Sequence, residues 1–202
     1  MKRLALQIFL CLVVGASLSS CQSSTKTEGL VEVAGRPVAL DSYNFSAIPY
    51  SKCRVLLKGS PYEGMLKAAV KGDRTTFTLT VNGADFSQEK YITGPSLLRF
   101  EGTNQETYDP PLTLASAPLS APDVSSWKGQ IVVGEDRFDA EAEIRVTEEN
   151  LNIKGGTFDA LHFEVTMTFN GDQTRTLDFW TVPDKGIIKR DFNGSSTREP
   201  LE

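Results

Sequence analysis

Apolar and polar residues alternate through most of the chain between residues 30 and 200, and turn-forming residues separate the alternating runs. The clearest run covers residues 161–170, where the odd positions are apolar and the even positions are polar. Successive side chains of a strand point to opposite faces, so this run places its apolar residues on one face. They are Leu161, Phe163, Val165, Met167 and Phe169. Such a strand is typical of an antiparallel sheet with one dry face.

No stretch of the same region keeps apolar residues at helical spacing for three turns. We therefore expect an all-β fold built as an antiparallel meander of about ten to twelve strands. A sheet with one apolar face must cover that face, which predicts a curved sheet, a half-barrel, a barrel or a sandwich.

The turns fix the expected strand register, because a slip of one residue would move every side chain to the wrong face. After Phe169, a two-residue Asn-Gly loop would mix the faces, whereas a loop of odd length centred on Gly171 keeps them apart. The resulting pairs are Val165 with Leu177, Phe163 with Phe179, His162 with Trp180, and Glu164 with Asp178, the last an unfavourable pair of like charges.

Other turns give further pairs on the same apolar face. Turns at Gly72-Asp73 and Asn82-Gly83 predict Leu66 opposite Leu79, Ala68 opposite Phe77, and Leu79 opposite Phe86. Loops at 134–137 and 147–150 predict Val133 opposite Phe138, Ile131 opposite Ala140, Trp127 opposite Ile144, Val146 opposite Leu151, and Ile144 opposite Ile153. Four prolines between Asp109 and Pro122 favour a crossover at 109–122, because each proline removes a donor from a sheet. The two halves on either side of it are expected to share one core within a β-rich domain over 30–202.

The first 20 residues are typical of an export signal. Lys2 and Arg3 precede an apolar run that ends at Leu18 and is too short for a spanning helix, which needs about 20 residues. The run is followed by Leu18-Ser19-Ser20-Cys21, which resembles the lipobox of bacterial lipoproteins. That resemblance implies cleavage before Cys21 and lipidation of its thiol. The alternative is an ordinary secretory signal with a cysteine nearby by chance.

Lipidation would attach the mature chain to a membrane without a transmembrane helix, because each buried methylene contributes about 0.8 kcal/mol. Residues 21–29 are polar and predict a flexible tether. Gln22 stands where an aspartate would be the inner-membrane retention cue, so the resemblance implies a bacterial cell envelope location, at the outer membrane if the host has one. Removal of the signal would change the formal charge from −5 to −7.

Several segments resemble a family of uncharacterised exported bacterial β-proteins. They are Tyr108-Asp109-Pro110-Pro111-Leu112, Trp127-Lys128-Gly129, Gly156-Thr157-Phe158-Asp159-Ala160 and Trp180-Thr181-Val182-Pro183-Asp184-Lys185-Gly186-Ile187-Ile188-Lys189. The resemblance covers roughly 108–190. It implies an exported protein with a curved antiparallel sheet, like that of periplasmic lipoprotein carriers, and supplies no catalytic residues.

Residues able to carry chemistry are few. An acidic chain has no broad basic surface for nucleic acid, so no nucleic-acid partner is expected. Cys53 alternates with Val55 and Leu57, which favours a buried apolar role over a nucleophile. His162, the only histidine, falls on the polar side of its strand, and no Gly-x-Ser-x-Gly elbow accompanies it.

The acidic cluster Glu135, Asp136, Asp139, Glu141 and Glu143 could suggest a calcium site or a glycosidase. Its last three members alternate with apolar residues, which favours a solvated outer face that protects the sheet from edge pairing. One histidine and one free cysteine do not make a zinc site of the usual kind, and Gly155-Gly156 lacks the remainder of a phosphate loop. We therefore expect no metal, no cofactor and no catalytic residues.

Three functions remain open at this point. The first is a non-enzymatic, lipid-anchored envelope protein that binds an apolar ligand or an envelope partner. The second is a surface hydrolase using His162 or the carboxylates, and the third is a purely structural scaffold. A cavity lined by Phe163, Val165 and Phe179 would favour the first; His162 in a cleft beside a carboxylate and a hydroxyl would favour the second; a fully packed interior would favour the third.

Overall fold

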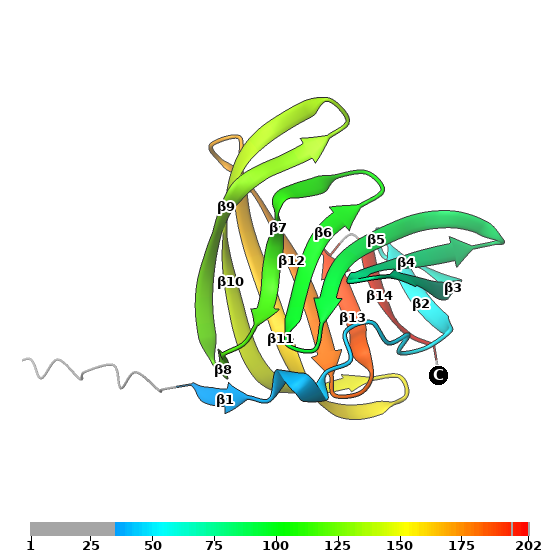
Figure 1. Ribbon diagram of the computed structural model, residues 1–202. Helices are drawn as coiled ribbons and strands as arrows, with labels where there is room; N and C mark the ends of the chain where they lie inside the picture. Colours follow the sequence, from blue (N-terminus) through cyan, green and yellow to red (C-terminus); the bar gives the residue numbers. More distant parts are fainter. Residues whose placement is uncertain (1–34, 195, 202) are drawn as a thin grey trace, which may run out of the picture. The chain divides into compact units, whose positions relative to one another are not determined.

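Twelve antiparallel strands close into a barrel in the part of the chain that the structure describes, residues 35–194 and 196–201 of a computed structural model (Figure 1). The order around the barrel is β10-β11-β12-β13-β14-β2-β3-β4-β5-β6-β7-β9. The strands are β2 (Lys52–Leu57), β3 (Ser60–Lys71), β4 (Arg74–Val81), β5 (Ala84–Gly94), β6 (Leu97–Thr103), β7 (Thr107–Ser116), β9 (Asp123–Val133), β10 (Asp136–Ile153), β11 (Gly156–Phe169), β12 (Gln173–Val182), β13 (Gly186–Phe192) and β14 (Ser196–Pro200). The all-β prediction is confirmed, and the barrel is the form that the sheet takes.

Two short elements lie outside this order. Strand β1 (Arg36–Val38) pairs with β8 (Leu119–Ala121), and a single 3-10 turn, η1 (Leu40–Ser42), follows β1. The barrel closes where β14 pairs with β2, which brings the last strand of the chain beside an early one. No described residue belongs to a helix long and apolar enough to cross a membrane.

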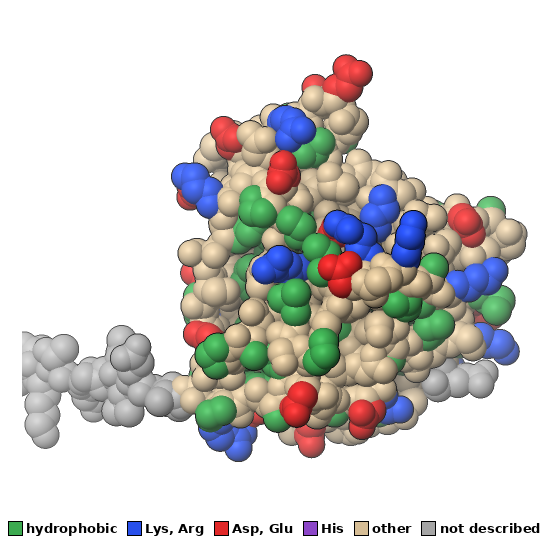
Figure 2. Space-filling model, viewed as in Figure 1, with side chains coloured by type: hydrophobic (Ala, Val, Ile, Leu, Met, Phe, Trp, Pro, Cys, Tyr) green, Lys and Arg blue, Asp and Glu red, His purple; other side chains and the backbone are tan. Residues whose placement is uncertain are grey.

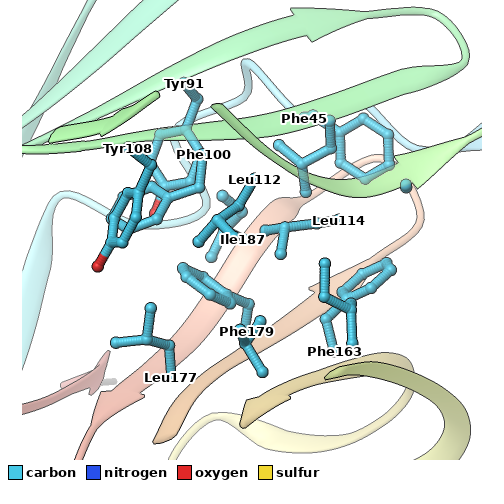
Figure 3. Packing of buried hydrophobic residues seen from close by; sticks show 14 of the residues in the cluster. Phe45, Tyr91, Phe100, Tyr108, Leu112, Leu114, Phe163, Leu177, Phe179 and Ile187 are labelled. Atoms are coloured by element: carbon cyan, nitrogen blue, oxygen red, sulfur yellow. The ribbon is translucent and has the colours of Figure 1, made fainter. Parts of the chain in front are cut away.

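The inward face carries the alternating apolar residues. Leu161, Phe163, Val165 and Met167 are 0% exposed, and they pack with aromatic residues from other walls of the barrel. Figure 3 shows Tyr91, Phe100 and Tyr108 grouped together, with Phe179 close to Phe100 at a ring-centroid distance of 5.2 Å. Full burial of such a side chain contributes about 1.5–3 kcal/mol, so this face supplies most of the stabilisation of the barrel.

Two predicted hairpins have the expected register. A three-residue loop, Asn170 to Asp172, sets Val165 opposite Leu177 and Phe163 opposite Phe179. The turn at Gly72-Asp73 sets Leu66 opposite Leu79 and Ala68 opposite Phe77. Asn170 and Gly171 have φ values of 50° and 84°, a region that asparagine and glycine tolerate best.

The residue pairs predicted for three hairpins are wrong. The turn at Asn82-Gly83 forms, but a β-bulge follows it, so Leu79 faces Ser87 and Phe86 becomes the extra, exposed residue. Strands β9 and β10 are joined by two residues, Gly134 and Glu135, and their pairs are shifted by two positions, with Phe138 opposite Ile131 and Trp127 opposite Ala142. A shift of two keeps the faces, which is why the alternation alone did not reveal it.

The third hairpin, expected at 147–150, does not form. Strand β10 runs through these residues and turns only after Ile153, so Val146 faces Phe163 and Leu151 faces Phe158. Beyond Val146 the apolar residues move from even to odd positions, a change that predicts a turn when alternation alone is considered. The change of phase instead builds a second apolar cluster on the opposite face of the sheet, formed by Leu151, Ile153, Ala160, Trp180, Val182 and Ile188.

The proline-rich segment is in part a strand rather than a crossover. Strand β7 runs through Pro110 and Pro111, and its pairing with β9 ends at Asp109. On its other side the ladder to β6 is irregular between Thr107 and Leu112. The two prolines therefore lie where neither neighbouring strand requires a donor, which explains why a barrel strand accepts them.

The two ends of the barrel differ. The segment 40–48 covers one end, where Phe45 is 1% exposed and the backbone N–H of Asp184 donates to the carbonyl of Ser42 at 3.0 Å. The other end, called the open end below, carries the hairpins β2–β3, β4–β5, β6–β7, β9–β10, β11–β12 and β13–β14.

On the outer surface in Figure 2, Lys and Arg side chains gather around strands β5 and β6, with hydrophobic side chains scattered between polar ones.

Candidate functional site

A cavity of about 370 Å³ lies at the open end. This volume falls in the usual range for small-molecule sites, about 300–1,000 Å³. Its wall combines apolar residues with two pairs of opposite charges. The lining residues are Leu57, Phe86, Ser87, Glu89, Thr103, Asn104, Gln105, Glu106, Arg175, Leu177, Arg190, Phe192, Asn193 and Ser196.

Two residues of the cavity wall, Glu89 and Arg190, belong to a buried ion cluster that also includes Arg198 and is called the inner cluster below. Glu89 Oε1 accepts a hydrogen bond from Arg190 Nε at 2.8 Å, and Glu89 Oε2 accepts one from Arg198 Nη2 at 2.9 Å. The three side chains are only 1–2% exposed. Arg190 and Arg198 face each other on β13 and β14, and Glu89 reaches them from β5, with three strands between β14 and β5.

Two tyrosines complete the inner cluster. The Tyr91 hydroxyl donates to Glu89 Oε2 at 3.1 Å, and Arg198 Nη1 donates to the Tyr50 hydroxyl at 2.7 Å. Burial alone would raise the pKa of Glu89, but the charges of Arg198 and Arg190 and their hydrogen bonds outweigh it and hold that pKa at about 2. Burial raises the pKa of Tyr50 to about 12 and that of Tyr91 well above its ordinary value. At neutral pH the carboxylate is therefore ionised and both hydroxyls are neutral.

A second charged pair lies on the cavity wall. Arg175 Nη1 donates to Glu106 Oε2 at 2.8 Å, and Arg175 Nη2 donates to the Tyr108 hydroxyl at 2.7 Å. The Tyr108 hydroxyl in turn donates to Glu106 Oε1 at 2.7 Å. The guanidinium also lies over the rings of Tyr108 and Phe169, 5.4 and 5.3 Å from their centroids. Arg175 is thereby fixed with its charge balanced by Glu106.

The apolar part of the wall comes from several strands. Leu177 on β12 is 3% exposed, and Phe86 in the β-bulge of β5 is 46% exposed at the rim. Leu57 on β2 and Phe192 on β13 complete this part. The deep apolar residues Phe163, Val165 and Phe179 are 0% exposed within the packed core and do not line this cavity. Packed side chains therefore fill the middle of the barrel, and the cavity lies at the open end.

His162 lies on the outer face of the barrel, as its strand position predicts, and stacks on Trp180 with ring centroids 4.4 Å apart. Its Nε2 is 2.8 Å from Asp178 Oδ1 and its Nδ1 is 3.5 Å from Glu149 Oε2. Trp180 Nε1 also donates to Glu149. We call these four residues the outer cluster. The imidazole lies between two carboxylates, those of Asp178 and Glu149.

The other candidates have structural surroundings. Asp139, Glu141 and Glu143 are exposed, and Lys128 Nζ lies 2.6 Å from Glu141. Within 35–194 and 196–201, no group of three or more His, Cys, Asp and Glu residues is placed to hold a metal ion. Cys53 is a free, fully buried cysteine, and burial raises the pKa of its thiol. Cys21, the signal and the tether lie outside the described residues.

Sequence reasoning missed the inner cluster and the Arg175 pair. One local signal was present: Glu89-Lys90-Tyr91 and Glu106-Thr107-Tyr108 both place a glutamate two residues before a tyrosine. Positions two apart share a face of a strand, so a tyrosine that points inward implies an inward glutamate. Their arginine partners are 69 to 109 positions away along the chain, and no local pattern identifies them.

No protein-family model and no curated protein matches the sequence. Two solved structures match the chain at low sequence identity. A protein of Parabacteroides distasonis, provisionally described as a lipoprotein, is 10% identical, with a TM-score of 0.44 over 77% of this chain and 96% of that one. A provisionally described exported protein of Bacteroides fragilis with a YmcC-like fold is 12% identical, with a TM-score of 0.42 over 78% and 97% of the two chains.

Proposed function

We propose that this chain is a non-enzymatic protein of the bacterial cell envelope, anchored by a lipid on Cys21, and that the open end of its barrel binds a small amphiphilic ligand. The observation that carries the binding role is the cavity at the open end, which combines an apolar wall with fixed, buried charges. Sites that bind small molecules combine these two features, since apolar contact supplies affinity and a few placed polar groups fix orientation.

The anchor is supported by the sequence. A basic start, a short apolar run and the Leu-Ser-Ser-Cys segment that ends at Cys21 occur together in the order of a lipoprotein signal. The polar tether at 21–29 would then separate the barrel from the bilayer. Gln22 after the cysteine favours sorting to an outer membrane where the host has one.

The chemistry of the cavity favours binding over catalysis. A general base at neutral pH works best with a pKa near 7, whereas Glu89 has a pKa of about 2 and is bonded to two guanidinium groups. Arg175 is likewise held by Glu106 and Tyr108. These groups are arranged to stay charged and fixed, which suits recognition better than proton transfer.

Labelling tests the anchor. Cells producing the chain are grown with labelled palmitate, and we expect the label on the wild-type protein and none on Cys21→Ser, which should also accumulate as uncleaved precursor. A Cys53→Ser variant is the matched control and should label normally. Normal labelling of Cys21→Ser would overturn the anchor.

Native mass spectrometry tests the binding role. The full chain is purified from its own envelope, and extracted lipids are identified in parallel. We expect a bound amphiphile on the wild-type protein that is lost from Ser87→Phe, in which a bulky ring obstructs the cavity, and retained by Ser87→Ala. A wild-type protein that carries no ligand, or a ligand that survives Ser87→Phe, would favour a structural scaffold or a partner docked elsewhere.

A further inference from the structure

The inner cluster buries more positive than negative charge. Two guanidinium groups and one carboxylate are 1–2% exposed, which leaves one uncompensated cation. Arg190 and Arg198 stand directly opposite each other on neighbouring strands, an arrangement that is unfavourable for like charges. Burying an unpaired charge costs free energy, so the cluster favours an additional anion nearby.

The rest of the cavity wall does not supply that anion. Arg175 and Glu106 balance each other, so the excess of one positive charge persists when this pair is counted together with Glu89, Arg190 and Arg198. Two wall residues also carry buried polar atoms that have no hydrogen-bond partner among the described residues, Ser87 Oγ and Arg175 Nε. Both can donate a hydrogen bond, so the wall is short of acceptors.

Apolar residues share the cavity wall with these groups. Leu177 and Leu57 lie in the wall, and Phe86 stands exposed at the rim. A small inorganic anion would leave these surfaces wet, whereas an apolar chain would cover them. With water occupying about 30 Å³ in the liquid, a cavity of about 370 Å³ holds roughly a dozen groups of that size. An eight-carbon chain with its head group has this size.

We infer that the cavity takes a short-chain amphiphile with an anionic head group, a carboxylate or a phosphate, whose charge lies beside Arg190 and whose chain lies against Leu177 and Phe86. The inference rests on the proposed binding role and adds the sign of the ligand's charge. The head group supplies the missing acceptor and anion together, and charge-assisted hydrogen bonds to arginine give it the advantage over a neutral head group.

Matched probes test the sign of the charge. Octanoate, octanol and octyltrimethylammonium are titrated calorimetrically into the full chain held in nanodiscs, and the heat for empty nanodiscs is subtracted. We expect octanoate to bind at least about tenfold more tightly than either other probe. Ser87→Phe should abolish binding of octanoate, whereas Ser87→Ala, which removes one donor and keeps the cavity open, should weaken it only a few-fold.

Two variants change the charge of the wall in opposite directions. Glu106→Gln adds one net positive charge and should tighten octanoate binding several-fold, whereas Arg175→Gln removes one and should weaken it about tenfold. Octanol binding should stay the same in both. Each variant predicts its own direction of change in octanoate binding. If one of them fails to fold, the other still tests whether the wall recognises an anion.

The outcomes separate the two proposals. Equal binding of all three probes, blocked by Ser87→Phe, would overturn the anionic head group and keep the amphiphile site. Acetate competing as strongly as octanoate would overturn the role of the apolar chain. If no probe binds, or Ser87→Phe leaves binding unchanged, the proposed binding role itself falls.

Discussion

The inner and outer clusters have mirrored chemistry. In the inner cluster a carboxylate, Glu89, lies between two guanidinium groups, at 2.8 and 2.9 Å. In the outer cluster an imidazole, His162, lies between two carboxylates, at 2.8 and 3.5 Å. Both clusters include aromatic side chains, since Tyr91 donates to Glu89 and His162 stacks on Trp180.

Burial separates them. The charged side chains of the inner cluster, Glu89, Arg190 and Arg198, are 1–2% exposed, whereas the ionisable side chains of the outer cluster are 17–39% exposed. Water screens the charges of the outer cluster, so exposed pairs contribute about 0–1 kcal/mol. Removing one partner from a buried cluster leaves a charge with neither water nor counterion, which costs about 3–5 kcal/mol. The distances between charged groups alone therefore do not predict how much an ion cluster contributes to the free energy of unfolding.

Removal of the central carboxylate should give the largest effect. Glu89→Gln keeps the size of the side chain and leaves Arg190 and Arg198 as two unbalanced cations in the core. We expect the free energy of unfolding in urea to fall by about 3–5 kcal/mol.

Glu149→Gln is the matched control in the outer cluster and should cost no more than about 1 kcal/mol. If both substitutions cost the same, burial would not explain the difference between the clusters.

The second-largest effect should come from acid, which weakens the inner cluster. The pKa of Glu89 lies near 2 in the folded chain and near 4.5 when the chain unfolds, so the folded state binds fewer protons between these values. Its stabilisation is complete above about pH 4.5 and is lost as the pH falls toward 2, a change of about 3 kcal/mol.

Urea unfolding of wild type and Glu89→Gln from pH 6 down to pH 2.5 checks this, because the carboxylates common to both proteins cancel in the difference. The difference in unfolding free energy should shrink steadily on acidification. A constant difference would contradict the lowered pKa.

Removal of one cation should cost less than removal of the carboxylate. Arg198→Met leaves the neutral pair Glu89 and Arg190, and it removes the hydrogen bonds of Arg198 to Glu89 and Tyr50 and its contact with the Tyr50 ring. We expect a decrease in unfolding free energy of about 1–3 kcal/mol. A larger loss than for Glu89→Gln would show that the cluster carries no excess of positive charge, and thermal unfolding of the two variants side by side measures the order.

Strand alternation predicted most of the fold and, within the outer cluster, the pairing of His162 with Trp180, but it placed Glu149 in a turn that does not form. The odd-length loop at Gly171 follows from keeping faces apart, and it places His162 opposite Trp180, which the structure confirms. Each wrong pairing has a local cause that alternation does not register. Phe86 is displaced by a bulge, and Leu151 changes face without a turn.

The inner cluster was beyond this kind of reasoning, because its members meet only when the barrel closes. Glu89 and Arg198 lie 109 positions apart, and alternation treats a glutamate or arginine as outward by default. The closure between β14 and β2 decides which strands stand across the lumen, and no single strand or hairpin encodes it. Only the two Glu-x-Tyr segments of the candidate site can be predicted from a local sequence pattern.

Removal of the imidazole should give the smallest effect. His162→Gln loses the stacking on Trp180 and the contacts to Asp178 and Glu149, but these partly exposed carboxylates stay hydrated and Lys189 Nζ keeps its place 4.3 Å from the Trp180 ring centroid. We expect a fall in unfolding free energy of at most about 1 kcal/mol, because the gain from an exposed pair is largely offset by side-chain ordering. Urea unfolding at neutral pH measures it, with Glu89→Gln as the buried counterpart. A loss above about 3 kcal/mol would mean that partial exposure does not screen the outer cluster, and the energetic contrast between the two clusters would fail.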